Sequence, residues 1–547
     1  MPGSGGVAHR TPVDLPTADG RRAQVLAGAL TVCLIAVWAI AYPKTPDLAA
    51  AVYRVELFRQ IGMAVWDEHW YAGHHLPGYS LLLGPLGTLV GLRALGMIAV
   101  AASTILFERL ARSFYGAPAG WGAAFFAVAA VGDVWAGRMA FALGVPFALA
   151  AALALRRGHP LASALLAGLC AAASPVAGAL LGLAGLTAAL ASGTRRPLLV
   201  LAVPAAVIVL ALAALFPEGG REPYPILSFA ATALVTLAFL AALPRSERGL
   251  RIGAVLYLLV CVGCLLIDSP FGSNIERYGV LLAGPLLLSS VLADRAAGAS
   301  TGARRSSPRA ALALALGAAV VWVLWGPVRE TVAVAGSPAT SAAYYAPVER
   351  FVATAPGGPL RIEVPLTRTH WEAALLAPSV SLARGWEKQM DTRYDSVLLR
   401  PGLTGAAYAR WLREQAVSYV ALPDVALDPS SAQEGRLIRS GPAFLREVSR
   451  SEHWRIFEVL GATPLVSGAA RLQSLGHDSF SLRAAAPGTD LVRVRYTRYW
   501  AVIAGHGCVS RAPGGWTSVR VSAPGTVVLE ARFSLGRAIG SGARTCA

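Results

Sequence analysis

The chain has 547 residues, of which 55% are hydrophobic and 14% are charged. Soluble globular proteins carry about 25% charged residues, so this composition excludes an ordinary soluble enzyme and predicts a polytopic membrane protein. The net charge of +17 would suggest nucleic-acid binding in a soluble protein. Here the basic residues are mostly arginines, and many lie in short loops between apolar segments, as the positive-inside rule requires. We therefore expect no nucleic-acid partner.

The first segments of the chain set its orientation. Residues 1–22 are rich in Gly, Pro and Thr and are expected to be disordered. They end in Arg21 and Arg22, and the apolar run 23–42 that follows is long enough to cross a bilayer. No small-residue cleavage site follows this run, so we expect a retained first span. The two arginines place the N-terminus in the cytoplasm.

The loop after this span, residues 47–79, is the most polar part of the membrane half. Its acids and histidines are Asp47, Glu56, Asp67, Glu68, His69, His74 and His75. An acid-rich loop at a membrane face suggests a site that handles a lipid-borne substrate. Other interpretations stay open. Asp47 suits the start of a surface helix after Pro46, Asp67 and Glu68 suit solvated charges, and the histidines suit an interfacial aromatic belt or a metal site.

Hydropathy predicts further membrane spans along residues 94–327. They lie near 94–107, 118–132, 139–155, 160–173, 176–192, 197–216, 225–243, 252–267, 278–293 and 310–327. Residues 76–92 are also apolar, but counting them as a span would put the basic loops outside. We therefore expect 76–92 to lie along the surface or to re-enter. This gives a membrane domain over 23–327 with about eleven transmembrane helices.

The predicted topology places alternate loops on the outer side, and these loops contribute a second set of polar side chains there. A carboxylate there can deprotonate an acceptor hydroxyl or hold a divalent cation such as Mg²⁺ or Mn²⁺, and an arginine can bind a phosphate. Arginines at span ends also snorkel without any ligand, and metal binding stays open. The predicted substrate-binding residues are Glu56, His69, His74, His75, Asp133, Arg138, Asn274 and Arg277.

The C-terminal part has the composition of a soluble domain. Residues 328–467 alternate short strands with helices, which predicts an α/β subdomain. Residues 468–547 show period-two stretches between turns, which predicts a β-sandwich. Cys508 and Cys546 are the only cysteines here, and we expect them to form a disulfide, which requires an oxidising, extracytoplasmic compartment. This agrees with the outside placement that the loops indicate.

Four short motifs carry a resemblance to a known family. They are WDEHWY at 66–71, GYSLLLGPL at 78–86, GDVWAGRMAFALG at 132–144 and NIERY at 274–278. With this layout the chain resembles the GT-C superfamily of polytopic membrane glycosyltransferases, and in particular actinobacterial members with a C-terminal extracytoplasmic domain.

The resemblance implies transfer of a sugar from a polyprenyl-phosphate donor to a cell-envelope glycan or lipid at the outer face of the plasma membrane. In the family the catalytic acid follows the first span, which implies Asp47, with Asp67 and Glu68 as alternatives. Arg138 and Arg277 would hold the phosphate. The chain lacks the family's acid pair at the early position. The alternatives are therefore a transporter or lipid flippase, and a non-catalytic envelope scaffold. Spans with almost no charge argue against transport.

Overall fold

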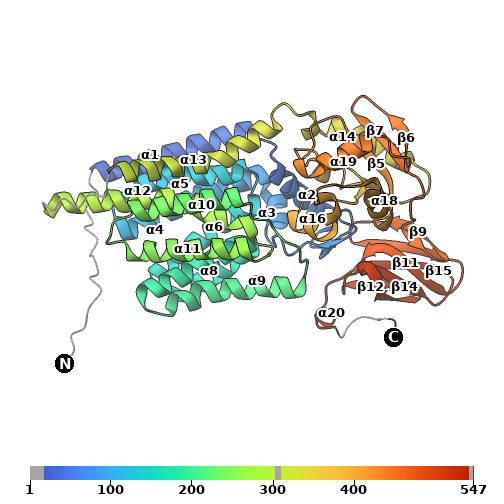
Figure 1. Ribbon diagram of the computed structural model, residues 1–547. Coiled ribbons are helices and arrows are strands. Elements are labelled where there is room, and N and C mark those ends of the chain that lie inside the picture. The colour runs from blue at the N-terminus through green and yellow to red at the C-terminus, as the bar shows by residue number, and fades with distance from the viewer. Residues whose placement is uncertain (1–17, 302–308, 541–545, 547) are drawn as a thin grey trace.

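The structure is a computed structural model that describes residues 18–301, 309–540 and 546. A bundle of helices, on the left in Figure 1, is joined to a strand-rich C-terminal region on the right. Residues 1–17, which we expected to be disordered, lie outside the described residues. Residues 18–22 correct that expectation, because the first helix already begins at Ala18.

The bundle consists of apolar helices that follow the predicted spans. They are α1 (Ala18–Ala41), α4 (Leu92–Tyr115), α5 (Ala119–Trp135), α6 (Met139–Arg156), α7 (Pro160–Ala173), α8 (Pro175–Ser192), α9 (Val203–Leu215, after a π-turn at Leu198–Ala202), α10 (Ile226–Ala242), α11 (Arg248–Leu266), α12 (Glu276–Thr301) and α13 (Arg309–Val334). In the described part of the chain, 8 segments are long and apolar enough to cross a membrane, and α5, α7 and α10 are apolar but shorter. The predicted polytopic helical protein is confirmed.

Small residues let these helices pack closely. A Cβ on Gly96 of α4 would collide with the ring of Trp38 of α1, and one on Gly122 of α5 would collide with Ser289 of α12. Between apolar helices in lipid, close van der Waals packing is a main source of association. The glycines in the spans therefore hold the bundle together.

No helix in the segment between the first span and α4 is among the described helices that are long and apolar enough to cross a membrane. It contains α2 (Pro46–Ile61), a two-stranded hairpin of β1 (Trp66–Asp67) and β2 (His74–His75), and α3 (Leu83–Val90). Helix α3 has 8 residues, which corresponds to about 12 Å and is far shorter than a bilayer core. This agrees with the expectation for residues 76–92.

The α/β subdomain contains one sheet with the strand order β4-β3-β5-β7-β6. Strand β3 is parallel to β4 and β5, and β7 is antiparallel to β5 and β6. The strands are β3 (Arg361–Glu363), β4 (Ser381–Leu382), β5 (Val417–Pro423), β6 (Leu445–Arg450) and β7 (Trp454–Val459), and the helices include α14 (Ala342–Thr354), α16 (Lys388–Tyr394), α18 (Gly405–Glu414) and α19 (Ala432–Arg439). The mixed pattern of strands and helices agrees with the expected class.

Two four-stranded sheets follow, with the orders β12-β15-β10-β9 and β13-β14-β11-β8. Their strands are β8 (Val466–Ser467), β9 (Ala470–Leu475), β10 (Ser479–Ala484), β11 (Gly488–Arg495), β12 (Trp500–Ala504), β13 (Gly507–Arg511), β14 (Trp516–Val521) and β15 (Gly525–Ala531). Alternate residues point into one shared core, for example Val519, Val521, Val527 and Leu529. This is the predicted β-rich C-terminal region.

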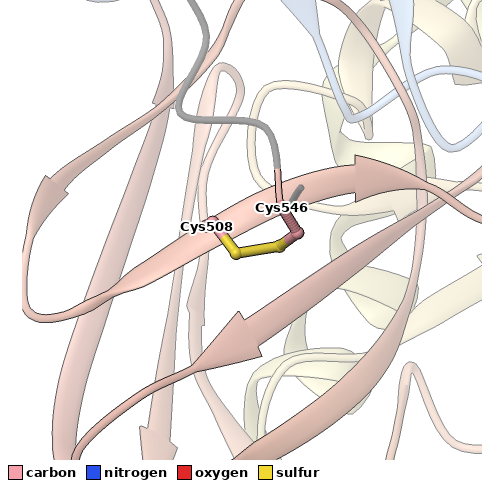
Figure 2. The surroundings of a disulfide bond; sticks show 2 residues. All are labelled: Cys508 and Cys546. Atoms are coloured by element: carbon pink, nitrogen blue, oxygen red, sulfur yellow. A yellow bond between two sulfur atoms is a disulfide. The ribbon is translucent and has the colours of Figure 1, made fainter.

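A disulfide joins Cys508 of β13 to Cys546 (Figure 2), with 5.2 Å between the Cα atoms. The two cysteines are separated by 38 positions. The closed loop contains β14, β15 and the short helix α20 (Leu535–Ala538). The disulfide therefore holds the last described segment of the chain against the sandwich.

Replacing Cys508 with Ser is expected to lower the free energy of unfolding of the sandwich by about 2–4 kcal/mol, because the open loop has more conformational freedom in the unfolded state. Thermal unfolding of the purified protein measures this loss. Cys33→Ala, which removes an exposed free cysteine, is the control and should leave the transition unchanged. An equal transition in Cys508→Ser and the wild type would contradict a stabilising role for the bond.

Candidate active site

The loops that the sequence analysis placed outside lie at one end of the bundle, against the C-terminal region (Figure 1). The amide of Arg221 donates to Thr392 Oγ1 at 2.9 Å, and Gln389 Nε2 donates to the carbonyl of Pro270 at 3.0 Å. Residues of the α/β subdomain thus cover the loops of the bundle. We call this contact zone the junction, and two groups of polar side chains lie in it.

The first group surrounds Arg138, at the start of α6. Its Nε is 3.7 Å from Asp47 Oδ2, and its Nη1 is 3.5 Å from Asp133 Oδ1. The Asp47 side chain is 40% exposed, whereas that of Asp133 is 4% exposed. Arg138 is therefore held between a buried carboxylate that orients it and an accessible one. Asp47 also lies in the first turn of α2, where the helix dipole favours an acid.

Gly137 makes the contact between Arg138 and Asp47 possible. Its φ is +83°, and a Cβ there would lie 2.8 Å from the Cα of Leu48. A side chain would therefore push the α5–α6 loop away from the first turn of α2. With glycine at this position, the loop packs directly on α2 and brings Arg138 beside Asp47.

Arg277, in the first turn of α12, completes this group. It lies within electrostatic range of Arg138, Asp47 and Asp133, and its guanidinium is 5.4 Å from the ring centre of Phe141. Among the described residues, Arg277 makes no hydrogen bond or ion pair. A second guanidinium without a carboxylate of its own gives this place the charge that an anionic ligand needs.

Glu222, from the loop between α9 and α10, reaches the same place. Its Oε1 accepts a hydrogen bond from Ser273 Oγ at 3.1 Å, and Lys388, Arg277 and Asp47 lie within electrostatic range. Burial raises the pKa of Glu222 to about 7, although the Ser273 hydrogen bond and the charge of Lys388 oppose the rise. A carboxyl group with a pKa near neutrality is suited to proton transfer at physiological pH.

The α/β subdomain adds further charge to this group through residues near α16. Glu387 Oε2 accepts a hydrogen bond from Arg54 Nη2 of α2 at 2.6 Å. The Arg54 guanidinium also lies 3.9 Å from the ring centre of Tyr79. The Tyr71 hydroxyl accepts from the amide of Glu387 at 2.9 Å. The candidate site is therefore built from both halves of the chain.

A groove leads away from Arg54 and Tyr79 between α2 and residues 76–85. It is lined by Arg54, Leu57, Phe58, Gly62, Met63, Ala64, Leu76, Pro77, Tyr79, Ser80, Leu81, Leu83, Gly84 and Pro85. Except for Arg54, Ser80 and the Tyr79 hydroxyl, this lining is apolar. The groove therefore has the character of a binding surface for a hydrocarbon chain with a polar end.

The second polar group is centred on Asp67, which is wholly buried. The Tyr53 hydroxyl donates to Asp67 Oδ2 at 2.8 Å, the His69 amide donates to Oδ1 at 3.1 Å, and His477 Nδ1 is 3.0 Å from Oδ1. Burial opposes ionisation of Asp67, but the hydrogen bond and charge of His477 lower its pKa to about 2. Burial also opposes protonation of His477, yet Asp67 raises its pKa above the ordinary value. The two form a buried ion pair.

The histidines near Asp67 form contacts between different parts of the protein. His69 Nδ1 is 2.6 Å from the carbonyl oxygen of Ala377 in the α/β subdomain. His75 Nε2 is 3.0 Å from Thr497 Oγ1 of the sandwich, and its Nδ1 is 2.7 Å from Glu218 Oε1 of the α9–α10 loop. These side chains therefore connect the bundle loops to both C-terminal parts.

Glu68 and His74 are equally buried. Burial raises the pKa of Glu68 well above its ordinary value, and the charge of Arg361 opposes this rise. The ring of His74 stacks on Trp70, with 5.6 Å between the ring centres. Asp67, Glu68, His69, His74 and His75 are all buried, and their predicted catalytic and substrate-binding roles stay a prediction.

Two other predicted substrate-binding residues, Glu56 and Asn274, either lie apart from the Arg138 group or make no side-chain hydrogen bond in it. Glu56 lies further along α2, and its side chain is 39% exposed, with its Oε2 3.2 Å from Arg59 Nη1. Asn274 lies in the turn Gly272–Ile275 before α12, and its side chain makes no hydrogen bond within the described residues. The sequence reasoning did not choose Glu222 or Lys388. Glu222 lies in a turn-rich outer loop that can be recognised from its low hydropathy between two spans. No local feature of the sequence indicates that Lys388 lies near this site.

The first polar group does not fit a divalent cation. In the described part of the chain, no three His, Cys, Asp or Glu side chains are grouped as a metal site. The carboxylates of Asp47 and Asp133 flank the guanidinium of Arg138, which takes the position that a shared cation would need.

Asp67→Asn is expected to destabilise the folded protein by about 3–5 kcal/mol, because it leaves a buried charge without its partner. The pKa of His477 is raised in the folded protein, so its contribution to stability is complete below its ordinary value of 6.5 and is lost as the pH rises through the folded-state value. Thermal unfolding as a function of pH should show this loss in the wild type and a smaller one in Asp67→Asn.

The matched control for this variant is Asp424→Asn. Asp424 also pairs with a histidine, His453, at 2.9 Å, but the two side chains are 49% and 34% exposed. A pair that is open to water contributes little to stability, because water screens the two charges. If Asp424→Asn and Asp67→Asn changed the stability equally, burial of the Asp67 pair would not be what stabilises the junction.

Glu222→Gln is expected to change how stability depends on pH. The ordinary pKa of Glu222 is 4.5 and its folded-state pKa is about 7, so in that window the folded protein keeps a proton that the unfolded chain has released. Stability should therefore fall as the pH rises through the window. Thermal unfolding should show a smaller fall in Glu222→Gln. Identical pH profiles would mean that Glu222 titrates as an ordinary glutamate.

Comparison with families of known proteins and with curated protein sequences finds no match. Among solved structures, the chain is similar to the arabinofuranosyltransferase AftD from Mycobacteria, with 17% identity and a TM-score of 0.46 over 90% of this chain and 42% of that one. It therefore spans less than half of that protein. It is also similar to the oligosaccharyltransferase of Archaeoglobus fulgidus, with 12% identity and a TM-score of 0.42 over 74% of this chain and 69% of that one.

Proposed function

We propose that this protein is a membrane glycosyltransferase that moves a sugar from a polyprenyl-phosphate donor to a hydroxyl of a cell-envelope glycan or lipid. The reaction takes place at the junction, on the outer face of the plasma membrane. The GT-C resemblance of the sequence suggested this class, and the geometry around Arg138 supports it.

The observation that carries the proposal is the pairing of two guanidinium groups with one accessible carboxylate. Arg277 lies within electrostatic range of Arg138, and its side chain makes no ion pair within the described residues. Asp47 lies 3.7 Å from Arg138 and is 40% exposed. Arginines bind phosphate oxygens through paired, charge-assisted hydrogen bonds, and a carboxylate next to them can accept a proton. The site thus offers both functions that the transfer needs.

The reaction can be written with these side chains. Asp47 accepts the proton of the acceptor hydroxyl while the hydroxyl oxygen attacks the anomeric carbon. A new glycosidic bond forms, and the bond from the anomeric carbon to the phosphate oxygen breaks. The electron pair of that bond leaves with the polyprenyl phosphate, whose added negative charge Arg138 and Arg277 stabilise. The apolar groove beside Arg54 and Tyr79 suits the hydrocarbon chain of a lipid substrate.

Two independent features support the proposed orientation. The basic loops lie at the end of the bundle away from the C-terminal region, which the positive-inside rule assigns to the cytoplasm. The disulfide between Cys508 and Cys546 belongs in an oxidising compartment. Both features support an outside placement of the junction and the C-terminal region.

Asp47→Asn is expected to lower the rate of sugar transfer by about 10²–10⁴-fold, because the amide cannot accept the proton. Arg277→Gln is expected to weaken donor binding by about 10–100-fold, because charge-assisted hydrogen bonds to the phosphate are lost. The measurement is transfer from a panel of radiolabelled polyprenyl-phosphate sugars to an envelope-lipid extract by the detergent-purified protein.

The matched control is Glu56→Gln, which changes an exposed acid on the same helix and should leave transfer unchanged. Transfer that survives in Asp47→Asn would remove Asp47 from the proposed role. Absence of both transfer and donor binding in the wild type would favour a non-catalytic scaffold. Lipid movement across sealed vesicles without sugar transfer would favour a flippase.

A further inference from the structure

The edge of the β-sandwich carries exposed apolar side chains on and around α20. Phe533 is 46% exposed, Leu535 is 74% exposed and Ile539 is 79% exposed. They lie within seven positions of one another, whereas the neighbouring Ala538 is buried in the sandwich core. Large apolar side chains that are exposed together mark a surface that contacts something other than water. We call residues 533–539 the apolar edge.

The apolar edge lies beside the end of a membrane span. The rings of Phe533 and Phe216 are 5.8 Å apart, and the Tyr499 hydroxyl donates to the carbonyl of Leu215 at 2.7 Å. Leu212 and Phe216 belong to the same hydrophobic cluster as the sandwich core. Figure 1 shows α20 next to the end of α9. The core of the sandwich is therefore continuous with α9, and the apolar edge extends this contact sideways.

Helix α9 faces lipid over most of its length. With the preceding π-turn it forms the candidate span Leu198–Leu215, of which only 17% is buried inside the protein. Leu215 is the last residue of this span, so it marks the level at which the hydrocarbon region ends. The apolar edge is in contact with this end of α9. Its exposed side chains therefore lie at the boundary between the hydrocarbon chains and the lipid headgroups.

Two arginines, Arg498 and Arg537, lie at the apolar edge. Arg498 Nη1 donates to the carbonyl of Ala538 at 2.7 Å, and Arg537 belongs to α20 itself. Neither arginine has a carboxylate partner among the described residues, whereas Arg532 pairs with Glu530 at 2.7 Å. Basic residues next to exposed apolar side chains are typical of segments that lie in the headgroup layer, where phosphate groups are available.

The disulfide closes a covalent loop that includes the apolar edge. The segment 533–539 lies between Cys508 and Cys546 along the chain, so both of its ends are tied to the sandwich. A tethered edge can stay in the interface without the loss of entropy that ordering a free tail would require.

We propose that the apolar edge is a membrane-docking surface, by which the β-sandwich dips Phe533, Leu535 and Ile539 into the outer lipid leaflet beside α9. Lipid is the occupant that the position selects, because any bilayer that surrounds α9 also meets residues next to Leu215. The docking would support the sandwich at a second point besides the junction. This inference does not depend on the glycosyltransferase activity.

The test uses the full chain in lipid nanodiscs, with the accessible free cysteines Cys33 and Cys264 replaced by Ala. A fluorescent label is attached in turn through Leu535→Cys, Ile539→Cys and the control Ser522→Cys. Ser522 is exposed in the turn before β15, at the end of that strand away from α20 and so about 20 Å further along it. Quenching is compared between lipids that carry a spin label near the headgroup and a water-soluble quencher.

The expected result is quenching by the spin-labelled lipid that is several-fold stronger at residues 535 and 539 than at 522, together with protection from the soluble quencher. Soluble quenching at 535 and 539 equal to that at 522 would overturn the proposal, because the edge would then lie in water. Protection from both quenchers would also overturn it and would indicate coverage by protein, such as a second copy of the chain. A label at each of the two sites guards against misfolding of one variant.

Discussion

The structure depends on the burial of one polar segment, residues 66–75, between the helical bundle and both C-terminal parts. Asp67 is held by His477 of the sandwich, and the backbone of Tyr71 accepts a hydrogen bond from Arg495 Nε at 2.8 Å. Ionised groups are stable inside a protein only when nearly every partner is in place. The C-terminal region can therefore pack on the bundle in one arrangement. This arrangement brings Glu387 and Lys388 near the loops around Arg138.

The acids of the first outer loop have different tasks because their surroundings differ. Asp67 has three hydrogen-bond partners and no contact with water, so its charge serves structure. Asp47 is two-fifths exposed and touches an arginine that a buried aspartate, Asp133, already orients. Such a carboxylate is accessible to solvent or to a ligand. A dense group of acids and histidines thus does not by itself show which acid is accessible, since exposure and partners decide.

Much of the fold can be predicted from the sequence, because apolar runs, Gly/Pro turns and period-two strands are local signals. The same signals place Asp133, Arg138 and Arg277 on one side of the membrane, and the pairing of the only two soluble-domain cysteines follows from their number. The surroundings of Asp67 cannot be predicted in this way. Its partner His477 is 410 positions away, and a buried ion pair and a solvated loop have the same composition. The position of Lys388 near Glu222 cannot be predicted for the same reason.

This distance along the chain also sets an order of events during synthesis. At about 5–20 residues per second, the 410 positions between Asp67 and His477 correspond to about 20–80 s in which Asp67 lacks this partner. The charge of Asp67 keeps the segment out of the lipid during that time. A chain that stops before residue 477 would retain its spans but leave Asp67 without its ion-pair partner at the membrane surface. Incomplete copies would therefore differ from finished ones in a feature that quality-control proteases can reach.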